Sequence, residues 1–293
     1  MEKKKMNSSE ILFLYDALRT NPNGDMDQEN KPRMDYDTNT NLVSDLRLKR
    51  YIRDYLQAAH NKSLFVTGEA ENAKDRVKQI LGREPDKKNP VTDEELRLIT
   101  EKCTDVIFFG AVLGTPGANS HVHGPVQFNW GYSLNTVEIQ ESRTTTSSFS
   151  SGEGVGKDYR VKYSFIAFSG GINGHVAETT GLSDDDVALL DEAMIKSIQF
   201  CRSRSKIGQT PRLYMRVILK DSTTNLKDLR ECISLANTEG LNSIDDVELQ
   251  FEELEKYLAV QGDKIEKILL WKDEKLNDIE IKPNGITIEK WKI

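Results

Sequence analysis

Short stretches of alternating or clustered hydrophobic residues recur along the chain and predict β-strands. Residues 11–15 form an uninterrupted apolar run, as expected of a buried strand. Residues 126–134, 161–168 and 213–219 have the apolar content and alternation of further strands. Near the C-terminus, two short apolar segments flank Pro283-Asn284-Gly285, and we expect residues 279–289 to form a terminal β-hairpin.

Hydrophobic residues spaced three and four apart predict helices between these strands. The first runs from about Leu42 to Ala59, with its apolar side formed by Leu48, Ile52, Tyr55, Leu56 and Ala59. The second begins after the N-cap Ser183, which three aspartates follow, and ends near Cys201. A later amphipathic helix is expected between Val247 and Val260.

The order of the central elements is strand, helix, strand, strand, helix, strand. This order is that of the ferredoxin-like fold, which RNA-recognition-motif domains share. We therefore expect an α+β fold with a ferredoxin-like, RRM-like core, or palm, in residues 1–60, 125–137 and 161–220. The stacking motif typical of RNA-recognition motifs is missing from residues 161–168, so base stacking on the sheet is not predicted.

The other segments are expected to be additions to this core. Residues 61–124 predict a helical insertion, in which Thr92 and Glu95 can form a capping box. Residues 138–160 are rich in Ser, Thr and Gly and predict a flexible arm that cannot build a core of its own. Residues 221–293 form an acidic extension at the C-terminal end.

Charge is distributed unevenly along the chain. The formal net charge is −7, which is unusual for a nucleic-acid-binding protein. However, residues 221–293 contain 10 Lys and Arg against 17 Asp and Glu, so the first 220 residues are neutral overall. Phosphate binding depends on local charge, because interactions between exposed charges are screened beyond about 8 Å at physiological salt.

Two basic groups stand out within the neutral part. In the first helix, Lys49, Arg50 and Arg53 lie opposite the apolar side, and Lys31 and Arg33 precede them in a long polar loop. The second group lies in residues 201–220, which contain no acid; its basic residues are Arg202, Arg204, Lys206, Arg212, Arg216 and Lys220. Basic residues on a surface are commonly just solvated, so neither group alone indicates a function.

Several motifs in order resemble one known family. The segment from Asn21 to Leu56 contains NPNGD, NKPRMDYDT and NLVSDLRLKRYIRDYL, and it is followed by DVIFFGA at 105–111, YSF at 163–165, GH at 174–175, TGLS at 180–183 and RSKIGQ at 204–209. Together these resemble the CRISPR-associated Cascade backbone protein, the Cas-seven family, with wording most similar to subtype I-B and next to subtype I-C. The resemblance spans roughly residues 10 to 220.

The resemblance implies a non-catalytic RNA-binding subunit, several copies of which line up along a CRISPR guide RNA. The implied partners are guide RNA, target DNA through the guide, further copies of the chain in a helical homo-oligomer, and other Cascade subunits. It also implies a fingers-like role for the insertion and a thumb-like role for the arm. The candidate RNA contacts are Asn21, Asn23, Lys31, Arg33, Ser44, Arg47, Lys49, Arg50, Arg53, Arg204, Lys206 and Gln209.

Two of these groups have open alternatives. Arg204, Lys206, Gln209 and Arg212 predict a second phosphate contact or a contact between subunits, and the sequence does not choose between them. Alternation also places Arg212 on the same side of its strand as Tyr214 and Arg216. In the arm, Phe149 is the residue best suited to wedge between bases or against a neighbouring copy.

Clustered carboxylates and histidines are the candidates for catalytic or metal chemistry. Carboxylates gather in the polar loop at Asp25, Asp27, Asp35 and Asp37, and they leave a metal-dependent ribonuclease as the alternative function. His121 and His123 lack further ligands nearby in sequence, so no metal site is predicted there. No cofactor motif is present.

The cysteines and the lengths of the apolar runs bear on the cellular compartment. Cys103, Cys201 and Cys232 are widely spaced, which argues against disulfides and a thiolate zinc site. No run approaches the roughly 18 apolar residues of a membrane span. We therefore expect a cytoplasmic protein, and a general single-strand binder is the third function considered.

Overall fold

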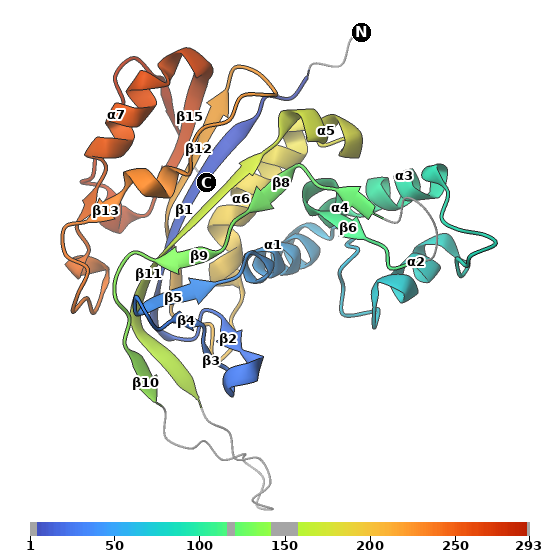
Figure 1. Ribbon diagram of the computed structural model, residues 1–293, viewed down its shortest axis with the longest axis horizontal. Helices are drawn as coiled ribbons and strands as arrows, with labels where there is room; N and C mark the ends of the chain where they lie inside the picture. Colours follow the sequence, from blue (N-terminus) through green and yellow to red (C-terminus); the bar gives the residue numbers. More distant parts are fainter. Residues whose placement is uncertain (1–4, 116–120, 142–157, 292–293) are drawn as a thin grey trace, which may run out of the picture.

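A large mixed sheet organises the protein, which is described here from a computed structural model covering residues 5–115, 121–141 and 158–291 (Figure 1). Within these residues the main path of the sheet runs β16-β15-β12-β1-β11-β9-β5-β4, and β8 and β10 also pair with β11. The strands are β1 (Ser9–Thr20), β4 (Met34–Asp35), β5 (Thr40–Val43), β8 (Val126–Phe128), β9 (Gly131–Ser133), β10 (Ile139–Glu141), β11 (Tyr159–Ile172), β12 (Gln209–Leu219), β15 (Ile265–Lys272) and β16 (Ile288–Lys290).

Helices cover one face of this sheet. They are α1 (Asp45–His60), α5 (Gly174–Thr180) and α6 (Asp184–Phe200). Because strand side chains alternate, Ile11, Phe13 and Tyr15 of β1 point to this face and join one hydrophobic core with the apolar residues of α1 and α6. The predicted order of central elements is present as β1, α1, β9, β11, α6 and β12, in a mixed α+β fold.

The acidic C-terminal extension covers the opposite face. Leu12 and Leu14 of β1 point into a second core, which they share with α7 (Glu252–Val260), β15 and the short pair β13 (Ser234–Leu235) and β14 (Leu249–Gln250). Burial of both faces is expected to stabilise the sheet at roughly 25 cal/mol for each Å² of apolar surface removed from water. It also closes the face that RNA-recognition motifs use for base stacking.

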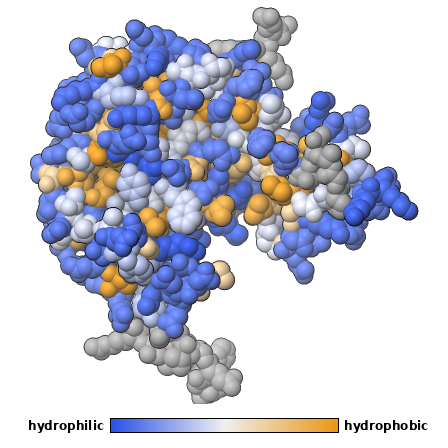
Figure 2. Space-filling view, viewed as in Figure 1, coloured by the Kyte–Doolittle hydropathy of each residue, from blue (hydrophilic) through white to orange (hydrophobic). Residues whose placement is uncertain are grey.

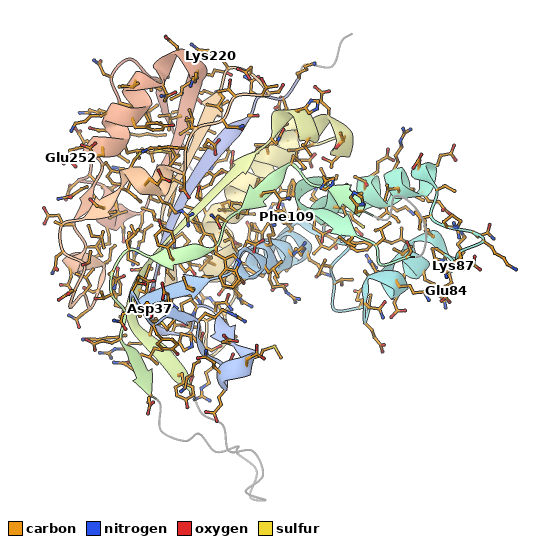
Figure 3. The ribbon with its side chains drawn as sticks, viewed as in Figure 1. Asp37, Glu84, Lys87, Phe109, Lys220 and Glu252 are labelled. Atoms are coloured by element: carbon orange, nitrogen blue, oxygen red, sulfur yellow. The ribbon has the colours of Figure 1, made fainter. Side chains whose placement is uncertain are left out.

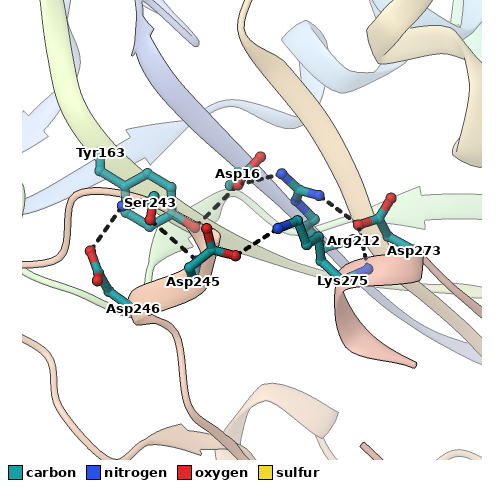
Figure 4. A network of polar contacts seen from close by, with 8 residues as sticks. All are labelled: Asp16, Tyr163, Arg212, Ser243, Asp245, Asp246, Asp273 and Lys275. Carbon is teal, nitrogen blue, oxygen red and sulfur yellow. Dashed lines mark hydrogen bonds and ion pairs between the residues drawn. The ribbon is translucent and has the colours of Figure 1, made fainter. Parts of the chain in front are cut away.

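A buried polar network fastens the extension to the sheet (Figure 4). The guanidinium of Arg212 donates to Asp16 of β1 at 2.9 Å and to Asp273 of the extension at 2.6 Å. The hydroxyl of Tyr163 donates to the same Asp16 carboxylate at 3.1 Å. Burial raises the pKa of Asp16, and the contacts with Arg212 oppose that shift.

This network corrects one expectation from strand alternation. Arg216 contacts Asp191 of α6 at 2.7 Å, on the helical face, whereas Arg212 contacts the extension on the other face. The register between β1 and β12 shifts at Leu14/Tyr15, and this irregularity breaks the alternation between the two arginines.

The insertion has a small core of its own and extends to one side of the sheet (Figure 1). It contains α2 (Ala73–Leu81), α3 (Asp93–Lys102), α4 (Thr104–Phe109), β6 (Gly110–Val112) and β7 (His121–His123). The capping box of Thr92 and Glu95 is confirmed at the start of α3. Figure 3 shows Phe109 where the insertion meets α1, and Glu84 and Lys87 toward the far end. Gly110 has φ +74°, and a Cβ there would lie 2.2 Å from the carbonyl oxygen of Val122.

Two predicted strand segments are wrong in detail. Residues 126–134 form two strands, β8 and β9, because the register against β11 shifts by one residue between Phe128, which pairs with Gly170, and Tyr132, which pairs with Ala167. The terminal hairpin is not formed: β16 pairs in parallel with β15, a strand that the sequence analysis did not predict. Ile281, expected in the hairpin, is buried in the core beneath the extension.

The described ends of the arm form the base of a hairpin. Ile139 pairs with Val161 and Glu141 pairs with Tyr159, as β10 and β11. Residues 142–157, which include Phe149, lie outside the described residues. None of the described helices is long and apolar enough to cross a membrane.

Candidate nucleic-acid interface

Two segments that carry candidate RNA contacts and are far apart in sequence meet beside the N-terminal end of α1. The backbone N–H of Asn21 donates to the carbonyl of Ser205 at 3.0 Å, and that of Leu18 donates to Gly208 at 2.8 Å. The ammonium of Lys206 donates to the carbonyls of Asn21 and Pro22. The structure thus joins residues 21–44, here called the polar loop, to residues 201–209.

Asn23 and Ser44 fix the polar loop to the start of α1. The side-chain oxygen of Asn23 accepts hydrogen bonds at 2.9 Å from both the backbone N–H and the hydroxyl of Ser44. Ser44 is the N-cap of α1, and its hydroxyl accepts from the N–H of Arg47 at 3.3 Å. The N–H of Arg33 donates to the carbonyl of Asn23 at 2.9 Å, so the same anchor positions the basic part of the loop.

The basic side of α1 is not the single exposed face that its spacing suggests. Lys49 is 7% exposed and Arg53 is 9% exposed, whereas Arg50 is exposed and pairs with Asp54. Lys49 donates to Asp45 at 3.1 Å and to Gln127 at 3.0 Å. The Asp45 contact is an i,i+4 pair within α1, and the Gln127 contact comes from a strand much later in the chain.

Arg53 is fixed by a buried carboxylate of the insertion. Its Nε donates at 2.8 Å to Asp105, which also accepts the backbone N–H groups of Phe65 at 2.6 Å and Val66 at 3.1 Å. The guanidinium carbon lies 5.2 Å from the centre of the Phe109 ring. Arg53 is therefore buried between the helix and the insertion, and RNA contact by Lys49 and Arg53 stays a prediction.

Arg47 and Gln209 connect α1 to the second basic segment. The Arg47 guanidinium stacks 4.2 Å above the ring of Tyr51 and donates to the Cys201 thiol at 3.8 Å. The Tyr51 hydroxyl donates to Gln209 at 3.2 Å, and Gln209 donates to the carbonyl of Lys206 at 3.2 Å. Arg47 has no carboxylate partner among the described residues, and its buried Nε has no hydrogen-bond partner there.

Lys206 is held in a poorly solvated position. Burial and, to a smaller extent, the nearby charge of Arg47 lower the pKa of its ammonium to about 7. Near neutral pH, a phosphate placed beside this amine would favour its protonated form. The site can therefore take up a proton when an anion binds.

The outer cations lie over aromatic rings or beside acids. Lys31, in β3 (Lys31–Pro32), lies 4.9 Å from the ring centre of Tyr159, and Arg33 lies 5.8 Å from that of Trp130. Arg204 is exposed and pairs with Asp158 at 3.1 Å. These aromatic partners were not predicted from the sequence. For Trp130 the available signal was an aromatic residue between Asn129 and Gly131, two residues that favour turns.

The aspartates of the polar loop have structural partners. Asp25, in β2 (Gly24–Asp25), accepts the N–H of Asp27 at 3.2 Å and lies 3.3 Å from Arg33. Asp35 accepts the N–H of Asp37 at 3.0 Å, and its hydrogen bond with Thr38 is the main cause of its lowered pKa. In residues 5–115, 121–141 and 158–291, no group of three or more His, Cys, Asp or Glu is placed to hold a metal ion.

The interface lies beside a hollow in the molecular surface. Figure 2 shows this hollow between the insertion and the part of the core that carries β2 and β3, bordered by hydrophilic residues with a few hydrophobic ones. Backbone N–H groups near a helix start and guanidinium groups are donors suited to the phosphates of a nucleic-acid backbone.

The fold is that of chains found in RNA-guided CRISPR assemblies. A structure titled "CRISPR RNA-guided surveillance complex, pre-nicking" aligns with a TM-score of 0.61 and 12% identity, covering 97% of this chain and 96% of that chain. A second, titled "CRISPR RNA-guided surveillance complex", aligns with a TM-score of 0.55 and 14% identity, covering 97% and 94%. At such identities the likeness shows the fold alone.

Sequence comparison identifies the family. A family model described as CRISPR-associated protein Cas7 matches residues 7–252. The "CRISPR-associated protein Cas7" of Haloferax volcanii is 33% identical over 304 residues, covering 92% of this chain and 88% of that protein. The chain therefore belongs to the Cas7 family, which confirms the family resemblance.

Proposed function

We propose that this Cas7-family chain is a backbone subunit of a type I CRISPR surveillance complex, with copies lined up along a guide RNA. The observation that carries the proposal is the Cas7 match over residues 7–252, which includes both the polar loop and residues 201–209, the segments that meet at α1. The sequence motifs of the polar loop favour subtype I-B, with subtype I-C next. In this role the core is a ferredoxin-like palm, and residues 61–124 and 138–160 act as fingers and thumb.

The polar loop and residues 201–209 would bind RNA through its phosphates. Lys31, Arg33 and Arg204 supply charge at the outer edge, while Asn23 and Ser44 keep the loop in place. Phosphate contacts fix position and carry no sequence information, which suits a subunit that accepts any guide. Target DNA is then read by pairing with the guide rather than by the protein.

The protein would act in the cytoplasm and without catalysis, together with other subunits of the complex. The loop aspartates already serve turns and an ion pair, which weakens the ribonuclease alternative. If they held catalytic Mg²⁺, purified protein would cleave RNA in a Mg²⁺-dependent way, and Asp25→Ala or Asp35→Ala would abolish that cleavage. We expect no cleavage from the unmodified protein.

Co-purification of guide RNA tests the proposal. The chain is expressed with its CRISPR repeats and companion subunits, and the bound nucleic acid is extracted and sequenced. We expect repeat–spacer RNA of uniform length in a large assembly. The double variant Lys31→Glu/Arg202→Glu changes two residues of the interface that have no carboxylate partner among those described, and it should lose most of this RNA.

The matched control is Lys256→Glu/Lys264→Glu, which makes the same change of charge on exposed residues of the extension. It should retain RNA at the normal yield. For a model single strand, each lost phosphate contact should reduce the slope of log K against log salt by about 0.7. Equal RNA retention by both double variants would overturn the proposed interface.

A further inference from the structure

Trp130 is an exposed aromatic residue at the edge of the proposed interface. It follows β8, and its side chain and backbone together are 44% exposed. In the antiparallel register of β5 and β9, Val43 pairs with Gly131. The next residues along these strands are Ser44, the N-cap of α1, and Trp130. The indole therefore lies beside the anchor that holds the polar loop.

The backbone around Trp130 is fixed, although its ring is exposed. Its N–H donates to the side-chain oxygen of Asn129 at 2.8 Å, and its carbonyl accepts from Arg230 at 2.7 Å. Arg230 is 5% exposed and is held by Asp228 at 3.0 Å. An ordered backbone and a solvent-facing ring together give a rigid aromatic surface at low entropic cost.

Packing does not explain the position of this indole. The chain has three tryptophans, and Trp271 and Trp291 both pack against the core beneath the helices. Trp130 belongs to none of the three hydrophobic clusters of the described residues. Its recorded ring contact is with the guanidinium of Arg33, 5.8 Å from the ring centre.

We propose that Trp130 stacks against a base of the single-stranded guide RNA while Arg33 contacts the adjoining phosphate. This inference rests on the proposed function. A cation near an exposed ring places charge for the backbone and a π-face for the base within one nucleotide of each other. Stacking on an aromatic ring tolerates any base, because every base has a π-face, and guides differ in sequence. The stacking surface thus lies at the loop edge instead of on the covered sheet.

Tryptophan fluorescence can report on this contact alone. In the full chain carrying Trp271→Phe/Trp291→Phe, Trp130 is the single remaining tryptophan. Addition of a labelled, unstructured RNA strand should quench its emission over the same concentrations at which the strand's anisotropy rises. An abasic strand of equal length retains its phosphates, and its binding should leave the emission unquenched.

Affinity measurements complete the test. Trp130→Ala should weaken RNA binding about tenfold, Trp130→Phe should recover most of the loss, and the salt slope should stay unchanged because no phosphate contact is removed. Unchanged thermal unfolding of Trp130→Ala shows that the fold is intact; if that variant is destabilised, the single-tryptophan chain carries the test.

The outcomes separate this inference from the function beneath it. RNA binding without quenching, or equal quenching by the abasic strand, overturns the stacking role and leaves the proposed function standing. An emission change that requires another protein subunit and no RNA also overturns it, because Trp130 would then be a protein-docking residue. Absence of RNA binding by the unmodified chain, alone and in its complex, overturns both.

Discussion

Replacing Arg53 by alanine should destabilise the protein rather than open an RNA site. Arg53 is 9% exposed and its partner Asp105 is 1% exposed, so the substitution leaves a buried carboxylate without its counter-charge. Breaking a buried ion pair from one side costs about 3–5 kcal/mol. Because Asp105 keeps the N–H groups of Phe65 and Val66, we expect the lower end, about 3 kcal/mol.

Arg50 provides the matched control on the same helix. Its side chain is half exposed and forms an i,i+4 pair with Asp54 at 2.7 Å, which is worth about 0.3–0.5 kcal/mol. Urea denaturation of Arg53→Ala and Arg50→Ala should therefore give free energies of unfolding that differ by at least about 2 kcal/mol. The melting temperature of Arg53→Ala should fall by about 5 °C.

A measurement of RNA binding by the same two variants can contradict this prediction. If Arg53→Ala is as stable as Arg50→Ala but loses RNA, then Arg53 is free to contact phosphate and the buried pair is not its main role. This comparison is sharper than reversing the charges of Lys49 and Arg53 together, since that change would place new acids beside Asp45 and Asp105.

Two further predictions concern pH, in separate windows. Lys206 has a folded pKa of about 7 against an ordinary 10.5, so between these values the unfolded chain binds more protons and the free energy of unfolding rises with pH. Lys206→Met should flatten that rise when urea denaturation is compared at pH 7, 8 and 9; an unchanged slope would show that Lys206 is solvated. Burial raises the pKa of Glu10 from 4.5 to about 7, so proton binding to this carboxyl stabilises the folded state. This stabilisation is full below pH 4.5 and is lost as pH rises through 7. Glu10→Gln should remove the loss between pH 5 and 7, and each variant serves as the other's control.

Local signals predicted α1, α3 and α6 because their determinants are adjacent in sequence, whereas the helix expected from Val247 begins only at Glu252. Ser183 with Asp186 and Thr92 with Glu95 form capping boxes, and the starts of α6 and α3 follow from them. The terminal hairpin failed for the opposite reason. Residues 288–290 pair with β15, and β15 itself forms a long ladder with β12 that no local pattern reveals.

The site was only partly predictable. Sequence identified both basic segments, and the structure brings them together through Lys206 and Asn21. It could not show that Lys49 and Arg53 have buried partners, because Gln127 and Asp105 are distant in sequence. The same holds for Trp130, whose alternating neighbours suggested a continuous strand until the break between β8 and β9 was seen.

The basic segment 201–220 divides into a strand part, whose arginines are paired, and a loop part, whose charges remain available. In the strand part, Arg212 forms ion pairs with Asp16 and Asp273. Arg216 forms an ion pair with Asp191. These pairs attach the extension and α6 to opposite faces of the sheet, so they serve folding and bring no charge to a ligand.

The loop part of the segment keeps charge available at the end of α1. Arg202 and Lys206 have no carboxylate partner among the described residues. Arg204 pairs with Asp158, and its side chain remains exposed. The surplus acids lie in residues 221–293, which cover the sheet face opposite the helices. Because exposed charges are screened over about 8 Å, this separation lets the net charge of −7 coexist with local attraction for phosphate. Net charge alone would have excluded an RNA-binding role that the arrangement of the charges supports.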